Sequence, residues 1–205
     1  DVTKYKELVI EDKKNRDNLI KLEQELSQLS SIKQNIKQKI DEYVEELGKL
    51  TQKRNEVVDE INSKAENISL SIEGLSNGER WLKEIRKELG KKDSFESSFR
   101  SLYDALFPQD KIDIAKYKEW LMFLLTSETG DITDICSEIK DQKFKAIWND
   151  KCKTNTLSSL FEIKLEDKIN INIVNGKQEL NILDGSPGQK SASILAFILS
   201  QGNDP

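Results

Sequence analysis

The stretch Leu19-Ile-Lys-Leu-Glu-Gln-Glu-Leu-Ser-Gln-Leu29 decides how the first third of this chain of 205 residues folds. Its leucines stand at positions 19, 22, 26 and 29, alternately three and four residues apart. A mean spacing of about 3.5 residues is the repeat with which an α-helix buries one stripe against a partner helix in a coiled coil. The sequence therefore predicts a coiled-coil helix around this stretch.

The same alternation runs outward from position 5 to position 68, a series of positions that we call the seam. Its apolar members are Tyr5, Leu8, Leu19, Leu22, Leu26, Leu29, Ile36, Ile40, Tyr43, Leu47, Leu50, Val57, Ile61 and Ile68, and its polar members are Asp12, Asn15, Lys33, Arg54 and Lys64. The prolines stand at 108, 187 and 205 only, so an unbroken helix of about 100 Å is permitted.

We expect residues 1–75 to form one arm of a coiled coil, antiparallel or dimeric, whose partner helix lies in this polypeptide or in another. Polar seam residues such as Lys33 and Arg54 either fix the register of that pairing or mark a loose stretch. An amphipathic helix of a bundle is the alternative interpretation of the same pattern.

The composition excludes several classes of protein. Hydrophobic residues make up 36% of the chain and charged residues 34%, whereas an average soluble domain has about 45–50% and about 25%, so one compact globule is not expected. The chain has no histidine, which excludes Ser/His/Asp and Cys/His catalysis and His-ligated metals within it. A net charge of −5 argues against a nucleic-acid-binding module that acts through its overall field.

Residues 76–155 are predicted to form a small all-α module that holds the base of the arm. Apolar residues at helical spacing predict one helix over 93–108, capped by Asp93 or Ser94, another over 114–126, and further turns from position 130 on. All three tryptophans, at 81, 120 and 148, lie here. The lysines at 140, 143, 145, 151 and 153 surround Phe144 and Trp148, and they either contact a nucleic-acid backbone or form a solvated helix face.

The two cysteines, Cys136 and Cys152, lack the spacing of metal ligands. A reduced, cytoplasmic protein is the preferred interpretation, and one disulfide between them stays open. No apolar run approaches the roughly 20 residues of a membrane span and no signal peptide is visible, so no membrane is expected among the partners.

In residues 156–205 the periodicity changes from helical to alternating. Strands are predicted over 161–165, 169–173 and 180–182, with a turn at Asn175-Gly176. The loop Asp184-Gly-Ser-Pro-Gly-Gln-Lys190 then leads into an apolar helix over 191–199, which Gly202 is placed to end. Free N–H groups and the positive helix end make the start of this helix an anion site. The predicted fold class is mostly α with a small α+β C-terminal lobe, in which a three-stranded antiparallel meander is followed by this helix.

The sequence Gly185-Ser-Pro-Gly-Gln189 resembles the signature loop of ABC-type ATPases, which usually reads Leu-Ser-Gly-Gly-Gln. Because a long heptad arm precedes the strands, the loop and the helix, the chain is similar in particular to the SMC/RecN/RecF-like branch. The resemblance implies that the Ser186 hydroxyl and the Gly188 amide contact the γ-phosphate of ATP bound to an opposite head. It also places Gln189 in the same loop and Lys190 just inside the helix.

Two residues depart from the family pattern. Gly185 replaces the usual leucine, which weakens one packing contact. Pro187 replaces the first glycine, which removes one N–H but fixes φ near about −65°, a value suited to a helix start. The alternative is an ordinary Ser-Pro-Gly turn that caps a helix.

Two further parts of such an active site are missing from the sequence. It contains no Gly-x-x-x-x-Gly-Lys-Ser/Thr loop, and no apolar strand ending in Asp-Glu follows the signature helix. Together with a first residue, Asp1, that is not methionine, the resemblance implies a fragment, with the phosphate loop before Asp1 and the Mg²⁺- and water-activating acids after Pro205. On this interpretation ATP and Mg²⁺ serve the complete protein, while the fragment binds nucleotide poorly and hydrolyses none alone.

The implied partners are a second ATPase head, as in a homodimer, a helix that pairs with the arm, and DNA for the full-length protein. Proteins of this family act in DNA repair, chromosome maintenance or defence against foreign DNA, including anti-phage defence, and the sequence favours none of these. The alternative function is a non-enzymatic coiled-coil adaptor whose C-terminal strands form a small docking domain.

Overall fold

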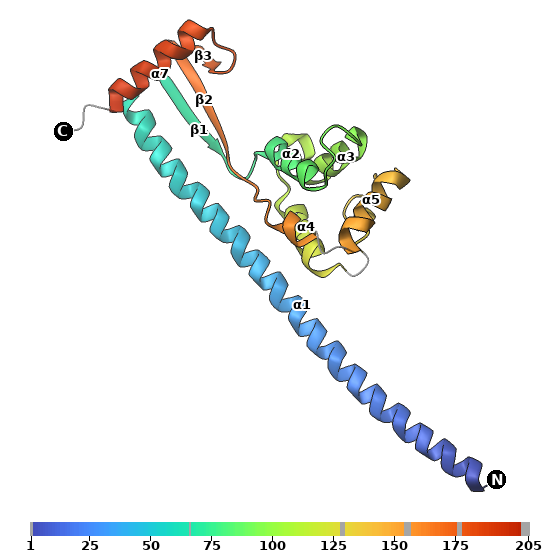
Figure 1. Cartoon of the computed structure of the whole chain (residues 1–205). Coiled ribbons are helices and arrows are strands. Elements are labelled where there is room, and N and C mark those ends of the chain that lie inside the picture. The colour runs from blue at the N-terminus through green and yellow to red at the C-terminus, as the bar shows by residue number, and fades with distance from the viewer. Residues whose placement is uncertain (1, 66, 128–129, 154–156, 176–177, 202–205) are drawn as a thin grey trace. The chain divides into compact units, whose positions relative to one another are not determined.

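A computed structural model describes residues 2–65, 67–127, 130–153, 157–175 and 178–201 of the chain (Figure 1). Its elements are α1 (Val2–Lys64), β1 (Ile68–Glu73), α2 (Gly78–Glu88), α3 (Glu96–Leu106), the 3-10 turn η1 (Pro108–Asp110), α4 (Ile114–Thr126), the 3-10 turn η2 (Ile132–Asp134), α5 (Gln142–Lys153), α6 (Leu157–Phe161), β2 (Lys168–Asn175), β3 (Gln178–Asn181) and α7 (Pro187–Gln201). The predicted fold class is confirmed, because the chain is mostly helical with one three-stranded antiparallel sheet in a small α+β lobe. The chain divides into two compact units, Asp1–Glu42 and Tyr43–Pro205.

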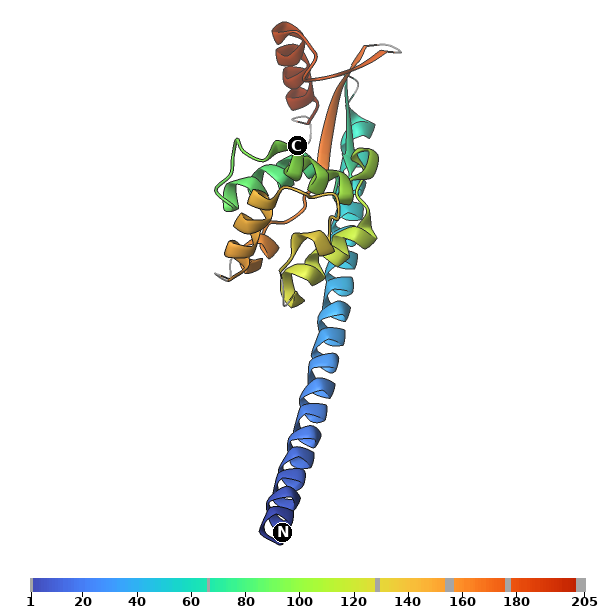
Figure 2. The same ribbon diagram turned by 90° about the vertical axis from the view of Figure 1, so that its right-hand side faces the viewer.

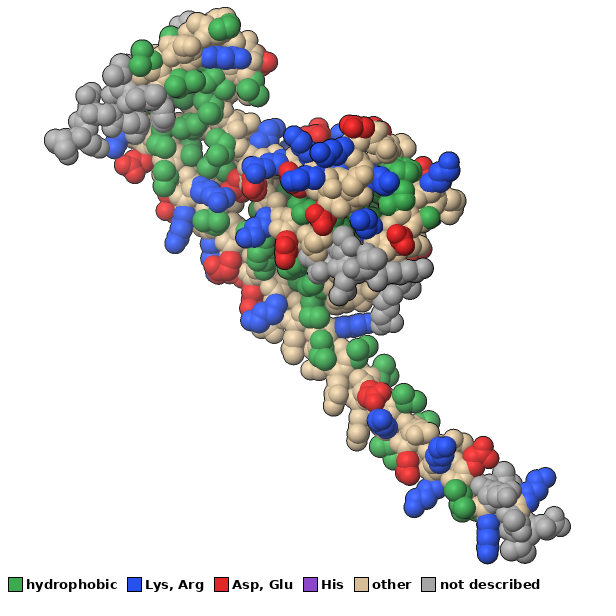
Figure 3. Space-filling model, viewed as in Figure 1, with side chains coloured by type: hydrophobic (Ala, Val, Ile, Leu, Met, Phe, Trp, Pro, Cys, Tyr) green, Lys and Arg blue, Asp and Glu red, His purple; other side chains and the backbone are tan. Residues whose placement is uncertain are grey.

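The unit Asp1–Glu42 consists of the N-terminal part of α1 in all its described residues. Ion pairs one turn apart support this helix, as between Arg16 Nε and Asp12 Oδ2 at 2.9 Å, although each exposed pair contributes only a few tenths of a kcal/mol. The apolar stripe is open to solvent from Leu19 to Leu29, with Leu22 64% and Leu26 68% exposed, and Figure 3 shows hydrophobic side chains at intervals among charged ones along this helix. A single long helix is thus shown, and its pairing in a coiled coil stays a prediction.

In the unit Tyr43–Pro205 the buried face of α1 departs from the seam. Buried or half-buried side chains include those at 44, 47, 51, 55, 58 and 62, a spacing close to the about 3.6 residues per turn of a straight helix. The seam residues Leu50 and Val57 are 42% and 55% exposed. A repeat of about 3.5 residues needs a supercoiled partner, so this part of α1 packs as a straight helix on its own lobe. The helical seam predicted to reach position 68 ends at Lys64, because Ile68 lies in β1.

The sheet has the order β1-β2-β3, and each neighbouring pair of strands is antiparallel. Three apolar pairs share one face, Ile68 with Ile173, Leu70 with Ile171 and Ile72 with Ile169. Serine, asparagine, glutamate and lysine side chains alternate with them and occupy the other face. This alternation is typical of an antiparallel sheet with one packed and one solvated face.

The outer edge of β1 is closed by a side chain of α1. The Asn62 Oδ1 accepts from the Leu70 N–H at 2.8 Å, and Asn62 Nδ2 donates to the Leu70 carbonyl oxygen at 2.8 Å. The Asn62 side-chain amide therefore pairs both the N–H and the carbonyl group of Leu70, which a neighbouring strand would otherwise pair. This pair of bonds holds the end of α1 along the sheet.

One predicted strand is wrong. Segments 169–173 and 180–182 correspond to β2 and β3, but Phe161 ends α6 and residues 162–165 form a turn and an irregular segment. The apolar residues at alternate positions there do not face a neighbouring strand, since Leu165 is buried and Ile163 lies beside Trp81 of α2. The third strand is β1, which the helical pattern had assigned to the arm. Gly176 of the predicted turn and Gly202, the predicted helix end, lie outside the described residues.

The helices α2 to α6 form an all-α module, which is inserted between β1 and β2, and α6 lies beyond the predicted bounds 76–155. Figures 1 and 2 show these helices gathered at the ends of β1 and β2 that lie away from β3. Its three tryptophans are almost fully buried. The ring centroids of Trp81 and Trp120 are 5.6 Å apart at an interplanar angle of 77°, and those of Trp120 and Trp148 are 5.8 Å apart. Aromatic packing of this kind supplies most of the buried apolar area of a small module.

The helix limits in this module agree with prediction for α4 and differ for α3. The helix predicted over 93–108 corresponds to α3, which spans only Glu96–Leu106. Neither Asp93 nor Ser94 caps it. Phe95 stands at the N-cap instead, in a left-handed conformation with φ of 59° and no side-chain cap. Its half-buried ring packs against Phe144, with the ring centroids 5.6 Å apart, a contact that a polar cap residue would not make.

Candidate functional site

Gly185 and Ser186 of the 185–189 loop stand between β3 and α7, whereas residues 187–189 form the start of α7, which begins at Pro187 and not at the predicted position 191. Short-range hydrogen bonds shape the segment that leads to them. The Asp184 N–H donates to the Asn181 carbonyl oxygen at 2.9 Å, and the Gly185 N–H donates to that of Ile182 at 3.3 Å. The Asn181 side chain accepts from the Leu183 N–H at 2.9 Å. These turns reverse the chain directly after β3, so that α7 lies beside the sheet (Figures 1 and 2).

Ser186 and Gln189 form a capping box at the start of α7. The Gln189 N–H donates to Ser186 Oγ at 3.3 Å, and the Ser186 N–H donates to Gln189 Oε1 at 2.8 Å. Pro187 occupies the first helical position, where an N–H would have no partner within the helix. The hydroxyl oxygen of Ser186 accepts in this arrangement, so its hydrogen stays available for an external acceptor.

Gly188 leaves the helix start open. No atom lies within 4 Å of the place where a Cβ would stand, and the residue is exposed. The Lys190 N–H already bonds the Ser186 carbonyl oxygen at 2.9 Å, whereas the Gly188 N–H has no hydrogen-bond partner in the described part of the chain. The first turn therefore offers two outward donors, the Ser186 hydroxyl and the Gly188 amide, at the positive end of a 15-residue helix.

The departure at Gly185 has a structural explanation. A Cβ at this buried position would stand 3.0 Å from Ile173 Cδ1 and 3.4 Å from the Ile182 carbonyl oxygen. The leucine of the family pattern would not fit without displacing Ile173. The packing contact that a leucine would make is thus supplied by a residue of β2.

The four residues predicted to contact nucleotide lie together, but they do different things. Ser186 and Gly188 present donors, while the Gln189 side chain is engaged in the capping box. Lys190 Nζ bends back and donates to the Leu183 carbonyl oxygen at 2.8 Å, so it ties the loop to the preceding turn. Their contact with ATP stays a prediction.

Apolar side chains remain exposed around this loop, and we call them the lobe patch. Its members are Ile169, Leu180, Leu183, Ile194 and Leu195. Figure 3 shows hydrophobic side chains gathered on this lobe. Several exposed apolar side chains on one lobe are typical of a surface that packs against another element or protein.

The sequence analysis missed a buried cluster at Asp167, just before β2. This carboxylate is 4% exposed and accepts from Thr51 Oγ1 at 2.8 Å, Arg54 Nη1 at 2.7 Å and the Leu75 N–H at 2.9 Å. Burial raises the pKa of Asp167, but the three hydrogen bonds and the Arg54 charge outweigh burial and hold that pKa below its ordinary value. Arg54, a polar member of the seam, therefore pairs within its own lobe. An isolated arginine in an apolar seam was the only signal for this pairing in the sequence.

In the predicted cluster of lysines around Phe144 and Trp148, lysines lie at the surface but the two aromatic rings do not. Lys140 and Lys143 are exposed, but Phe144 and Trp148 are each 1% exposed in the core of the module. These rings belong to the core of the module, and contact of the lysines with a nucleic-acid backbone stays a prediction. The side chain of Lys153 lies outside the described residues.

Cys136 is a buried residue of the same module. Its Sγ donates to the Ser101 carbonyl oxygen at 3.4 Å, and burial raises the pKa of the thiol. A buried thiol with a raised pKa is typical of a packing residue and not of a nucleophile. The side chain of Cys152 lies outside the described residues.

Comparison with known proteins adds no family: no family model matches the chain, and no curated protein or solved structure is significantly similar to it. Among the described residues no group of three or more histidine, cysteine, aspartate or glutamate side chains could hold a metal ion. None of the described helices is both long enough and apolar enough to cross a membrane.

Proposed function

We propose that this chain is part of a coiled-coil ABC-type ATPase of the SMC/RecN/RecF-like class, and that its 185–189 loop contacts ATP held by a second head. The observation that carries the proposal is the pair of outward donors, the Ser186 hydroxyl and the Gly188 amide, at the start of α7. The order of long helix, antiparallel sheet, loop and apolar helix supports it further.

The chemistry of the loop suits a terminal phosphate. ATP would supply the γ-phosphate, and the loop would bind it with neutral donors and the positive end of α7. The missing Cβ at Gly188 lets the backbone approach the phosphate closely. The 185–189 loop contains no carboxylate, which fits a phosphate and not Mg²⁺, so the metal would be held by the opposite head.

In this proposal the loop binds, orients and excludes water, and it moves no proton itself. Two heads that close over ATP bury the Ser186 hydroxyl and the Gly188 N–H, and hydrogen bonds to a charged phosphate strengthen when water leaves. The lobe patch would pack against the rest of the head, and the apolar stripe of the arm would pack against a partner helix. DNA is the proposed substrate of the complete machine, in repair, chromosome maintenance or defence, and its proposed place is the cytoplasm.

The test uses the protein expressed from its complete reading frame. Ser186→Arg is expected to abolish ATP-dependent dimerisation and to lower ATP turnover at least about 100-fold, because a long cation replaces the donor that faces the phosphate. The matched control is Ser97→Arg, which puts the same side chain at an exposed position in the first turn of α3. The control is expected to dimerise and turn over ATP like the wild type.

Normal turnover by Ser186→Arg would refute the assigned role of the loop. A complete reading frame without a phosphate loop and an Asp-Glu strand would favour the alternative, a coiled-coil adaptor that uses the exposed stripe of α1 and the lobe patch for docking.

A further inference from the structure

A cavity of about 300 Å³ opens between α7 and the sheet, and we call it the lobe cavity. Its walls come from β2, β3 and α7 and from Asn67, the residue before β1. The volume lies at the lower end of the range of about 300–1,000 Å³ that small-molecule sites have. No sequence motif pointed to this place.

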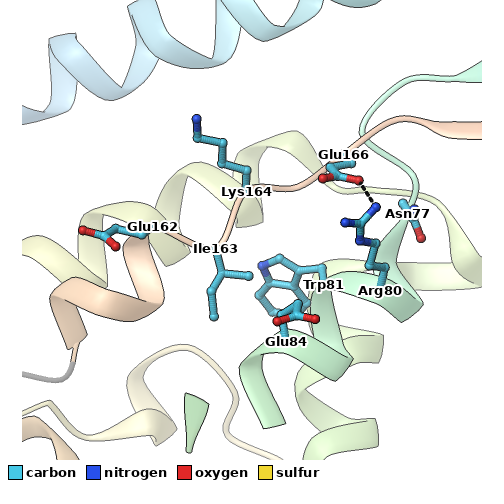
Figure 4. Close-up of a pocket in the computed structure, with 8 residues that line it drawn as sticks. All are labelled: Asn77, Arg80, Trp81, Glu84, Glu162, Ile163, Lys164 and Glu166. Carbon is cyan, nitrogen blue, oxygen red and sulfur yellow. Dashed lines mark hydrogen bonds and ion pairs between the residues drawn. The ribbon is translucent and has the colours of Figure 1, made fainter. Parts of the chain in front are cut away.

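Another cavity, of about 330 Å³, lies in the helical module (Figure 4), and it offers less to a ligand. Among its charged side chains, Arg80 pairs with Glu166 at 2.7 Å and Glu84 pairs with Lys87 at 3.1 Å. The Trp81 Nε1–H has no partner among the described residues, but solvent does not reach it. A ligand in that cavity would therefore have to break ion pairs or displace the core.

Four uncharged polar side chains line the lobe cavity, those of Asn67, Gln178, Gln189 and Ser193. Ser193 is only 7% exposed, its hydroxyl has no hydrogen-bond partner in the described part of the chain, and its oxygen keeps contact with solvent. The exposed Asn67 and Gln178 side chains also lack a partner within the described ranges. Gln189 Oε1 accepts from the Ser186 N–H at 2.8 Å, which leaves its Nε2 as a donor. The cavity thus presents both donors and acceptors that a ligand can reach.

The remaining walls of the lobe cavity are apolar. Ile173 and Leu180 are register partners in β2 and β3, and together with Val174 they line the cavity from the sheet, while Ala192 lines it from α7. No charged side chain of a described residue lines it. A phosphate, a carboxylate, an ammonium group or a metal ion would lose its hydration there without meeting a counter-charge. The lining therefore selects an uncharged ligand with apolar faces and a polar edge.

We infer that the lobe cavity binds an adenine base. The base is flat and uncharged, and its faces pack between the sheet and α7. The Gln178 amide pairs with the adenine N6 amino group and N7, the bidentate contact typical of asparagine and glutamine, and the Ser193 hydroxyl donates to a further ring nitrogen. A single peptide group offers one donor and one acceptor, too few for four polar side chains. The inference concerns a base and does not depend on phosphate contacts of the 185–189 loop.

The test titrates the ¹⁵N-labelled chain with adenosine, which has no phosphate, and follows it by NMR. The backbone N–H cross-peaks of Gln178, Leu180 and Ser193 are expected to move saturably, and the indole cross-peak of Trp120 in the helical module is expected to stay in place. Purine riboside, the matched control ligand, lacks the exocyclic amino group. It is expected to bind at least about fivefold more weakly, because the bidentate contact is lost.

Ser193→Ala removes the unpaired hydroxyl and keeps a good helix former in α7. It is expected to weaken adenosine binding about three- to tenfold, the effect of one hydrogen bond. Gln178→Ala, at an exposed residue that leaves the core untouched, is expected to weaken it by at least as much. Ser191→Ala, at an exposed residue of the same helix outside the cavity, is the control and is expected to leave binding unchanged.

Three results would overturn the inference: cross-peaks that stay in place, equal binding of purine riboside, or unchanged adenosine binding by both Ser193→Ala and Gln178→Ala. None of them bears on the 185–189 loop, which is tested by ATP-dependent dimerisation of the complete protein. The failure of one proposal is therefore distinguishable from the failure of the other.

Discussion

Asp167 joins α1, the start of the helical module and the start of β2 through one buried carboxylate. Its partners are a side chain of α1 at Arg54, another at Thr51 and the backbone N–H of Leu75. Arg54 is 47% exposed, so solvent screens its charge and the backbone bond carries more of the stabilisation. Removal of the carboxylate charge leaves a buried N–H with a poorer acceptor.

Asp167→Asn is expected to lower the free energy of unfolding by about 2 kcal/mol at neutral pH, measured by urea denaturation. The deficit is expected to shrink as the pH falls. Because the pKa of folded Asp167 lies below its ordinary value of about 3.9, the unfolded chain binds more protons between the two pKa values, and stability rises with pH there. The wild-type advantage is therefore complete above about pH 4 to 5 and is lost as the pH falls through the folded pKa.

Glu166→Gln is the matched control for this residue, because its ion pair with Arg80 is exposed on both sides. It is expected to change the free energy of unfolding by less than about 1 kcal/mol. Equal effects of the two substitutions, or a deficit for Asp167→Asn that does not vary between pH 7 and pH 3, would contradict the role given to the buried cluster.

At the scale of elements, α1 has two different faces along its length. From Leu19 to Leu29 the apolar seam is exposed, as at Leu22 and Leu26, whereas within Tyr43–Pro205 a straight-helix face that includes Val44 and Val58 is buried. The change follows from geometry, because a strict seven-residue repeat suits a supercoil and a packed straight helix buries residues every about 3.6 positions. One continuous helix thus carries an exposed apolar stripe and, further along, a face that packs on its own lobe.

The prediction at the scale of elements concerns the contact between Ile173 of β2 and Gly185, which precedes α7. Gly185→Leu restores the family's residue but is expected to destabilise the lobe by about 1–3 kcal/mol, because the added side chain meets Ile173. Combining it with Ile173→Ala is expected to recover part of this loss, measured by urea denaturation and a double-mutant cycle. Ile173→Ala alone is the control, and strictly additive effects would show that the two positions do not share one space.

At the scale of the unit Tyr43–Pro205, the helical module is an insertion whose ends meet. Glu73 and Lys168 are register partners in β1 and β2, and the Asn77 N–H donates to the Glu166 carbonyl oxygen at 3.0 Å. The aromatic core, with all three tryptophans, lies within the inserted residues. An insertion with adjacent ends and its own core has the properties of a domain that folds alone.

Residues 74–167 expressed alone are therefore expected to show blue-shifted tryptophan emission and one cooperative unfolding transition. Phe99→Asp in the same fragment is the control and is expected to unfold it, since Phe99 is fully buried. Emission typical of solvent-exposed indoles in the unsubstituted fragment would show that the core needs the sheet or α1 to form.

The sequence predicted those features that depend on neighbours a few residues apart. Helical spacing located α1 and α4, alternation located β2 and β3, and the Ser-Pro-Gly-Gln order predicted an exposed helix start with Ser186 and Gly188 as donors. The same local patterns misled at 161–165, where the alternating residues do not form a strand, and at Phe95, where a half-buried ring stands at the N-cap position without a side-chain cap.

What the sequence determined by itself was therefore the long helix α1, the helix α4 and the strands β2 and β3, because each arises from interactions along one turn or one strand. Only the tertiary structure decided that Ile68 begins an edge strand, that Arg54 pairs with Asp167, that Ile173 takes the place of a leucine at position 185, and that the Trp81 indole lacks a partner. Arg54 and Asp167 are 113 positions apart, and such partners meet only through the path of the whole chain.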